Sequence, residues 1–438
     1  MVLNTEEDRV RTVCTRDASQ SQKFRFNVGA KSFTQQYAKF YETRLNTFND
    51  NLNEAVQHSW GSDVPIRQIC DVVLGERCVL LGTIFKQMPL QPSILKELGE
   101  ELNIPTQPVM DNFTSDEDVL ILEDMLQRIV LIGDIKADNF VTGVCVAVKG
   151  REDERKPGYF NVEEVCYPQL RPSPPPACQD DAEVLFVSGL EFGGSKHSPM
   201  AAQLLVDFVS GSLGNEEARR ICRVIVAGNL VSPEVHDKEQ HYKAKYLMKS
   251  AVAGTVDAVK DVSSWLNLLT RTVPVTIMPG ESDPSNATLP QQPLHPCMFA
   301  DENECLESST NPYECDIAGV RILGHSGQPC NNIKMYSKLE NSVDIMKRCL
   351  DWAHMAPTAP DTMACYPYTD NDPFIIKNCP HLFFAGNQNT LEGDYYSSGD
   401  GKHCLCISVP KFSETGLCVR VNLRTLTWEP VLLSGDCE

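Results

Sequence analysis

The sequence predicts two folded parts, a small all-β domain followed by an α/β domain. Short strand-like runs fill most of residues 64–167. From residue 184 onward strands alternate with helices, the order that gives right-handed crossovers and a mostly parallel sheet. Between the two parts lies RPSPPPA, residues 171–177. Consecutive prolines cannot join a helix or a central strand and favour an extended spacer, so they predict the domain boundary.

Composition agrees with two domains and excludes several classes of protein. The chain has 438 residues, 42% of them hydrophobic and 22% charged, and a chain of this length is usually divided between two or three cores. Apolar runs stay below the roughly 18 residues that span a bilayer. The first residues show no basic-then-apolar signal, so we expect a nuclear or cytosolic protein without a membrane partner. The net charge of -20 disfavours direct DNA binding as the main activity.

The predicted boundaries follow from these changes in composition. Residues 1–31 are polar and weakly patterned, which predicts a flexible lead-in. The first domain, residues 32–170, begins with an amphipathic helix or a helical pair, because apolar residues recur at three- and four-residue steps: Tyr37, Tyr41, Leu45, Phe48, Leu52 and Val56. A linker at residues 171–180 precedes the α/β domain of residues 181–438.

The strands of the first domain favour a small Greek-key barrel. They are the runs CVLLGTIFK (78–86), RIVLIGDI (128–135), VTGVCVAVKG (141–150) and YFNVEEVCY (159–167). The oligonucleotide/oligosaccharide-binding (OB) barrel is the leading interpretation. Nucleic-acid-binding versions need aromatic residues interleaved with Lys or Arg. Here the aromatic residues lie among Asp and Glu, which favours a protein-binding or structural barrel over a single-strand DNA binder.

The 18 cysteines do not form a metal-binding pattern. They are scattered, and the closest pair is Cys404 and Cys406. Cys297, Cys305 and Cys315 lie in one loop-like region, but their spacing does not match a structural zinc site. We therefore expect free thiols in a reducing compartment and neither metal nor cofactor.

In the second domain three strands and two helices are expected to alternate. The strands are VLFV (184–187), RVIVA (223–227) and a run from Val273 to Met278; helices are expected over residues 201–213 and 243–269. A further helix is expected at residues 341–354. Later strands, which would form a second sheet packed on the first, are expected at residues 381–385, 405–409, 418–422 and 428–432.

Several of these strands end in glycine-containing turns at corresponding places. They are SGLEFGG (188–194), GNLVS (228–232), PGESD (279–283) and GNQN (386–389). Ligands bind beyond the carboxyl ends of the strands in open α/β sheets, so a catalytic site would be placed here.

These loops resemble those of the calcineurin-like metallophosphoesterases, which hold two metals through D-x-H-x-G, G-D-x-x-D, G-N-H-[DE] and G-H-x-H motifs. Aligned on them, Gly189 stands at the first aspartate, Glu191 at the first histidine and Asn229 at the bridging aspartate. A two-metal site needs bridging carboxylates and imidazoles.

The remaining motif positions depart in the same way. Glu281 and Ser282 replace the asparagine and histidine of the third motif, and Asn387 and Asn389 replace the last two histidines. The resemblance therefore implies an inactive phosphoesterase domain in which these seven positions are vestigial and hold no metal.

Longer stretches resemble one branch of that superfamily, the B-subunit family of replicative DNA polymerases, and within it the small subunits of polymerase delta. The matching text includes SFTQQYAKFYETRL, GTIFKQMPLQPSILKEL, VPVTIMPGESDPSNATLPQQPLHPCMF and HMAPTAPDTMACYPY. The resemblance covers most of the chain from about Ser32. It implies a non-catalytic scaffold that binds the cysteine-rich C-terminal domain of the catalytic subunit and a third, clamp-recruiting subunit, and that reaches the sliding clamp and DNA through the complex in the nucleus.

One alternative is an active metal-dependent phosphoesterase or nuclease with a remodelled site around Glu191, Asp283, His295 and His325. Single histidines near strand ends are more often structural hydrogen-bonding residues than ligands. The other alternative is residual binding of single-stranded DNA by the barrel.

Overall fold

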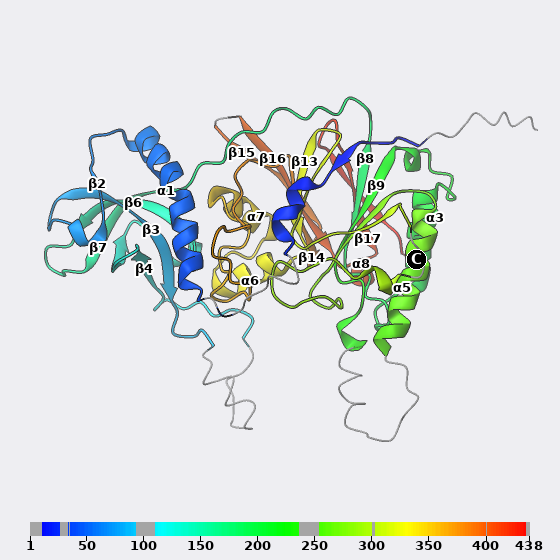
Figure 1. Ribbon diagram of the computed structural model, residues 1–438, viewed down its shortest axis with the longest axis horizontal. Helices are drawn as coiled ribbons and strands as arrows, with labels where there is room; N and C mark the ends of the chain where they lie inside the picture. The colour runs from blue at the N-terminus through cyan, green and yellow to red at the C-terminus, as the bar shows by residue number, and fades with distance from the viewer. Residues whose placement is uncertain are drawn as a thin grey trace, which may run out of the picture. The chain divides into compact units, whose positions relative to one another are not determined.

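The computed structural model describes residues 11–26, 34, 36–92, 110–235, 254–299, 303–399 and 401–434. The chain divides into two compact units (Figure 1). Unit 1 comprises Met1–Lys31, Pro172–Gln328 and Pro380–Glu438, and unit 2 comprises Ser32–Arg171 and Pro329–Cys379. The predicted combination of an all-β barrel with an α/β domain is confirmed.

A six-stranded sheet in the order β11-β10-β9-β8-β17-β18 forms one layer of unit 1. The strands β8, β9, β10 and β11 are parallel, and β17 runs antiparallel to β8. The three predicted strands are confirmed, and every residue of β8 and β10 is buried, as in a sheet covered on both faces. The bounds are β8 Glu183–Val187, β9 Ile221–Ala227, β10 Val275–Met278, β11 Leu306–Ser308, β17 Leu417–Asn422 and β18 Trp428–Leu432.

Two helices cover one face of this sheet and lie side by side in Figure 1. They are α3, Pro199–Ser210, and α5, Gly254–Thr270. The side chain of Ser198 caps α3, with proline at its first position and Gly211 in the left-handed conformation after its end. The two helices are joined by a 2.9 Å hydrogen bond from Trp265 Nε1 to the carbonyl of Ala202. Residues 243–253 of the expected helix lie outside the described residues.

A second six-stranded sheet, β1-β12-β13-β14-β16-β15, packs on the other face of the first. Phe186 of β8 and Phe384 of β14 meet across the interface with ring centroids 4.9 Å apart. The prediction of a second sheet is confirmed for β14 and β16, whereas β17 and β18 extend the first sheet. The bounds are β1 Arg16–Asp17, β12 Tyr313–Ile317, β13 Val320–His325, β14 Leu382–Gln388, β15 Glu392–Ser398 and β16 Lys402–Pro410.

The start of the chain is packed where a flexible lead-in was predicted. β1 pairs antiparallel with β12, and the short 3-10 helix Ser19–Phe24 follows it. Phe24 is fully buried, and Ser21 exchanges hydrogen bonds with the backbone of Glu314. The prediction for residues 1–31 was therefore wrong over residues 11–26, because two strand residues and one aromatic anchor give too little pattern to detect.

Unit 2 contains a closed barrel in the order β2-β3-β4-β5-β7-β6, which the pairing of β3 with β6 completes. Closure removes exposed sheet edges. The four predicted runs form β3, β5, β6 and β7, and β2 and β4 are additional strands. The bounds are β2 Ile66–Arg67, β3 Arg77–Gln87, β4 Val119–Glu123, β5 Arg128–Gly133, β6 Cys145–Glu152 and β7 Tyr159–Cys166.

The predicted amphipathic helix is α1, Ala38–Trp60, which packs on the barrel (Figure 1). Its buried face runs through Phe40, Arg44, Phe48 and Leu52, whereas Tyr37 is exposed. Over the first turns the buried face of the helix therefore differs from the predicted apolar face, because a pattern of apolar residues cannot identify a buried arginine.

A second correction concerns residues 329–379, which were assigned to the α/β domain but belong to unit 2. This segment carries most of α6, Gln328–Tyr336, and all of α7, Ser342–Asp351. The predicted helix at residues 341–354 is confirmed as α7. Among the described residues no helix is both long and apolar enough to span a bilayer.

Candidate functional site

The loops that follow β8, β9, β10 and β14 meet at one end of unit 1. The backbone of Gly189 donates to Gly228 O at 2.9 Å, and Glu191 N donates to Asn229 O at 3.1 Å. The Asn387 side chain donates to Ala227 O at 3.0 Å and to Ser326 O at 2.8 Å. The structure therefore brings most of the predicted strand-end positions together.

Three of these side chains stand on left-handed backbone. Glu191, Asn229 and Asn387 have φ angles of 50°, 55° and 53°. Non-glycine residues adopt this region uncommonly, and asparagine tolerates it best. A β-carbon at Gly228, where φ is 84°, would lie 2.7 Å from the α-carbon of Gly280. The strand ends therefore approach too closely for a larger residue at that turn.

Asp283 is the most constrained carboxylate of the site. It is 5% exposed; Oδ1 accepts from Val231 N at 2.9 Å and Oδ2 from Gly280 N at 2.7 Å. Burial raises its pKa to about 6, although the hydrogen bonds from backbone amides act in the opposite direction. Both oxygens therefore serve to join the β9 and β10 loops.

The neighbouring polar residues are engaged in the same way. Ser282 donates its backbone N–H to Asn229 Oδ1 at 3.3 Å and its hydroxyl to Val231 O at 2.6 Å. Each of these contacts ties one strand-end loop to the next. Ser282 and Asn229 thus act as cross-links within the loop cluster.

Gly189, at the first predicted ligand position, is crowded by two side chains. A β-carbon there would lie 2.8 Å from Asn387 Oδ1 and 2.9 Å from Lys411 Cγ. Contacts below 3.0 Å essentially never occur, so one neighbour would have to move. The loop conformation as it stands leaves no room for a carboxylate side chain at position 189.

Lys411 was not identified from the sequence. Its ammonium lies 3.0 Å from Glu191 Oε1, and Ser413 donates to Glu191 Oε2 at 2.9 Å. Glu191 is 5% exposed, so its charge is balanced by a lysine located 220 positions further along the chain. Only the tertiary structure, in which the segment of Lys411 lies beside the end of β8, identifies this lysine as the partner of Glu191.

The other predicted residues do not join this cluster. Glu281 and Asn389 are exposed. His295 is exposed and accepts from Cys297 N at 3.2 Å, which caps a short 3-10 helix. His325 is fully buried at the end of β13, and burial lowers its pKa to about 3, so the ring is neutral near pH 7.

A buried amide network was also missed. Asn311 Nδ2 lies 2.8 Å from Gln291 Oε1 and 2.7 Å from Ser326 Oγ, and Gln291 donates to Gly280 O at 2.8 Å. The network fixes the loop after β10 to the turn after β13. Within the described ranges, no group of three or more His, Cys, Asp or Glu side chains is arranged to hold a metal ion.

Unit 2 contains a separate buried polar cluster around Arg44. Its guanidinium donates to Asp372 Oδ2 at 2.7 Å and to the carbonyls of Gly143, Pro357 and Ala359 at 3.1, 2.8 and 2.5 Å. Both charged side chains are fully buried. Burial opposes ionisation of Asp372, but the Arg44 charge and the contact with His354 outweigh it and hold the pKa of Asp372 well below its usual range.

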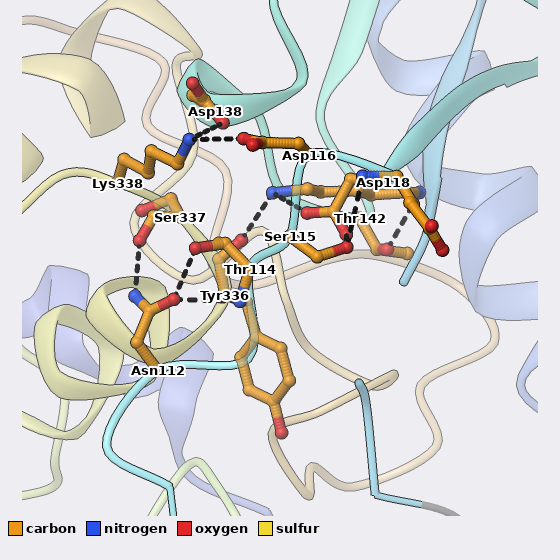
Figure 2. A network of polar contacts seen from close by, with 12 residues as sticks. Asn112, Thr114, Ser115, Asp116, Asp118, Asp138, Thr142, Tyr336, Ser337 and Lys338 are labelled. Carbon is orange, nitrogen blue, oxygen red and sulfur yellow. Dashed lines mark hydrogen bonds and ion pairs between the residues drawn. The ribbon is translucent and has the colours of Figure 1, made fainter. Parts of the chain in front are cut away.

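A second network joins the barrel domain to the end of α6 and the residues that follow it (Figure 2). Asn112 donates to the carbonyls of Lys334 and Ser337 at 2.7 and 2.8 Å. The Lys338 ammonium lies 3.3 Å from Asp116 and 3.2 Å from Asp138.

The same segment also contacts a buried ion pair. The Lys86 ammonium donates to Tyr336 O at 2.9 Å and lies 3.2 Å from Asp118 Oδ2. Both side chains of the pair are fully buried. These contacts explain why residues 329–379 belong with the barrel.

Comparison with known proteins gives the family. Residues 184–392 match the DNA polymerase alpha/epsilon B-subunit family, and residues 36–165 match the DNA polymerase delta subunit OB-fold domain.

Full-length relatives agree with these matches. The chain is 36% identical over 405 residues to the DNA polymerase delta small subunit of Oryza sativa subsp. japonica, covering 91% of this chain and 93% of that protein. It is 36% identical over 421 residues to DNA polymerase delta subunit 2 of Drosophila melanogaster, covering 94% and 96%. It is 30% identical over 482 residues to the Saccharomyces cerevisiae small subunit, covering 98% and 96%. This chain belongs to the family of DNA polymerase delta small subunits.

Proposed function

We propose that this chain is a non-catalytic accessory subunit of the DNA polymerase delta holoenzyme. The support is the family membership, which extends over both units. In this proposal it links the catalytic subunit, through that subunit's cysteine-rich C-terminal domain, to a third subunit that recruits the sliding clamp. It works in the nucleus and reaches DNA through the complex.

Unit 1 serves in this proposal as an inactive calcineurin-like phosphoesterase domain used as a scaffold. The observation that carries this part is the crowding at Gly189, where a ligating side chain would collide with Asn387 and Lys411. Asp283 supports it, because both of its oxygens accept backbone hydrogen bonds. Fold and chemistry separate readily in evolution, so loss of the ligands leaves a rigid body available for partner contacts.

The partner assignment is tested by co-expression of the full chain with a tagged C-terminal domain of the catalytic subunit. We expect the two to co-purify in equal amounts through size-exclusion chromatography. The third subunit, added to this complex, should bind without displacing the catalytic domain. Failure of the soluble, folded chain to retain the catalytic domain would refute the scaffold role.

The absence of catalysis is tested with a phosphodiester substrate. The purified chain is incubated with bis-p-nitrophenyl phosphate and Mn2+, and its metal content is measured before and after dialysis. We expect no hydrolysis above background. Activity that is abolished in Asp283→Ala and retained in Glu281→Ala, an exposed neighbour, would establish the remodelled phosphoesterase instead.

The role of DNA is tested on the isolated chain. With a net charge of -20, the chain should show no salt-dependent affinity for a single-stranded oligonucleotide between about 0.05 and 0.2 M salt. Affinity that falls steeply over this range would show that the barrel binds DNA by itself.

A further inference from the structure

Lys411 lies against the two positions that align with the first metal-binding motif, Gly189 and Glu191. The segment that carries it follows β16 and runs parallel to the end of β8. The hydrogen bond of 2.9 Å from Ser413 N to Gly189 O belongs to this pairing. The backbone therefore fixes the point from which the Lys411 side chain starts, directly beside the motif.

The aliphatic stem of Lys411 fills the space in which a side chain at position 189 would lie. A β-carbon on Gly189 would be 2.9 Å from Lys411 Cγ and 3.0 Å from its α-carbon. Two side chains cannot occupy one volume in a close-packed interior. The lysine α-carbon is held by the pairing with β8, so it cannot move aside freely. An aspartate at position 189 would thus displace Lys411 from its present place.

The ammonium of Lys411 supplies a positive charge at the position that aligns with the first histidine. It lies 3.0 Å from Glu191 Oε1, and it is the polar partner that this oxygen has among the described residues. Glu191 Oε2 accepts from the Ser413 hydroxyl at 2.9 Å. The Glu191 side chain is only 6% exposed. A carboxylate buried to this degree is stable only beside a cation, so its charge depends on Lys411.

A third position of the former site borders the same space. Asn387 aligns with one of the last two histidines, and its side-chain N–H groups donate to the carbonyls of Ala227 and Ser326. These two bonds fix the amide, and its Oδ1 lies 2.8 Å from the place of a β-carbon on Gly189. Within the described part of the chain this buried oxygen accepts no hydrogen bond. A carboxylate and an amide oxygen, which are ligands of hard cations, therefore adjoin the space that the lysine fills.

We propose that Lys411 has replaced both the aspartate and the cation of the first phosphoesterase motif. Its stem occupies the volume of the aspartate side chain, and its ammonium balances the charge of Glu191 in place of a divalent ion. The inference rests on the proposed origin of unit 1 as an inactive phosphoesterase domain. It adds a cause to the loss of ligands, because a fixed positive charge at this position repels a second cation.

Variants at three positions separate the volume of the lysine from its charge. Lys411→Met keeps an unbranched stem and removes the charge, whereas Lys411→Ala removes both. The control is Lys196→Met, because Lys196 makes an exposed ion pair with Glu414 close to the same loops. Each Lys411 variant is also combined with Glu191→Gln, which removes the carboxylate that would be left without its cation.

Thermal unfolding of the full chain measures the coupling between the two charges. Lys411→Met should lower the melting temperature by at least about 4 °C, because Glu191 stays buried without its cation. Addition of Glu191→Gln should recover at least about half of this loss. Lys196→Met should change the melting temperature by less than about 2 °C, since exposed ion pairs contribute little.

Mn2+ tests whether the ammonium acts as the cation of the site. At about 10 mM it should raise the melting temperature of Lys411→Ala by at least about 2 °C, because the ion can enter the space left by the lysine. It should not stabilise the wild type or the combination of Lys411→Ala with Glu191→Gln.

The outcomes separate this inference from the scaffold role. Equal losses for Lys411→Met with and without Glu191→Gln would overturn the inference and leave the scaffold role standing, and so would a Lys411→Ala variant that Mn2+ does not stabilise. Stabilisation of the wild type by Mn2+ that Glu191→Gln abolishes would overturn both the inference and the proposed absence of a metal site in unit 1.

Discussion

Replacement of Arg44 by methionine is the most informative perturbation of unit 2. Methionine keeps the unbranched apolar stem and packs adaptably, so the change removes chiefly the charge and the donors. It leaves Asp372 buried, with His354 Nε2 at 2.9 Å and Phe374 N at 2.9 Å as its remaining partners. The carbonyls of Gly143, Pro357 and Ala359 lose the donor that they share.

The expected loss is large because both charges are fully buried. Removing one member of a buried ion pair typically destabilises a protein by about 3–5 kcal/mol. Each carbonyl left without a donor adds about 1 kcal/mol or more. We expect Arg44→Met to lower the free energy of unfolding of unit 2 by about 6–8 kcal/mol.

The pH dependence of this destabilisation is a more specific test. In the wild type, burial and then the Arg44 charge lower the pKa of His354 to about 4. The stability that comes from the neutral ring is present above the unfolded pKa of about 6.5 and is lost as pH falls. Without Arg44 the pKa of His354 rises, since Asp372 then favours the imidazolium. The loss of stability in the variant, relative to the wild type, should therefore be smaller at pH 5.5 than at pH 8, by at most about 1.4 kcal/mol because burial still lowers the pKa of His354.

The measurement is urea denaturation at pH 8 and 5.5, monitored by peptide-resolved hydrogen exchange. Lys39→Met on the same helix is the control, because Lys39 makes an exposed ion pair with Glu42 and such pairs contribute less than about 1 kcal/mol. A deficit for Arg44→Met as small as that of the control, or one that does not change with pH, would refute the reasoning.

Three further predictions concern other buried titratable side chains. The folded pKa of His325 is about 3, so the free energy of unfolding of the wild type should decrease by about 3 kcal/mol as pH falls from 6.5 to 4. His325→Asn should abolish this decrease. A variant whose stability in urea changes with pH as that of the wild type does would contradict this. The folded pKa of Asp283 is about 6, so the stability of the wild type should decline by about 2 kcal/mol as pH rises from 4 to 6. Asp283→Asn should abolish this decline, while the exposed control Glu281→Gln should follow the wild-type profile. Lys86→Met should destabilise unit 2 by about 3–5 kcal/mol, whereas Lys338→Met, which removes an exposed ion pair, should have a much smaller effect. Equal losses in thermal unfolding would show that burial of the pair is not the cause.

The sequence alone determined those features that depend on neighbouring residues. The runs that became β8, β9 and β10 are mostly apolar because both faces of their sheet are covered. The turns at Gly228 and Asn387 were visible because glycine and asparagine are the residues that accept left-handed backbone. The family was visible for the same reason, since its most specific text is one uninterrupted stretch.

Tertiary structure alone decided which distant residues become partners. Arg44 and Asp372 are 328 positions apart, and Lys411 reaches Glu191 only through the pairing of later strands. Periodicity assigned Arg44 to no buried face, and chain order placed residues 329–379 in the wrong domain. A buried charge is stable only where a partner from elsewhere in the chain offsets its desolvation, and no local pattern records where that partner is.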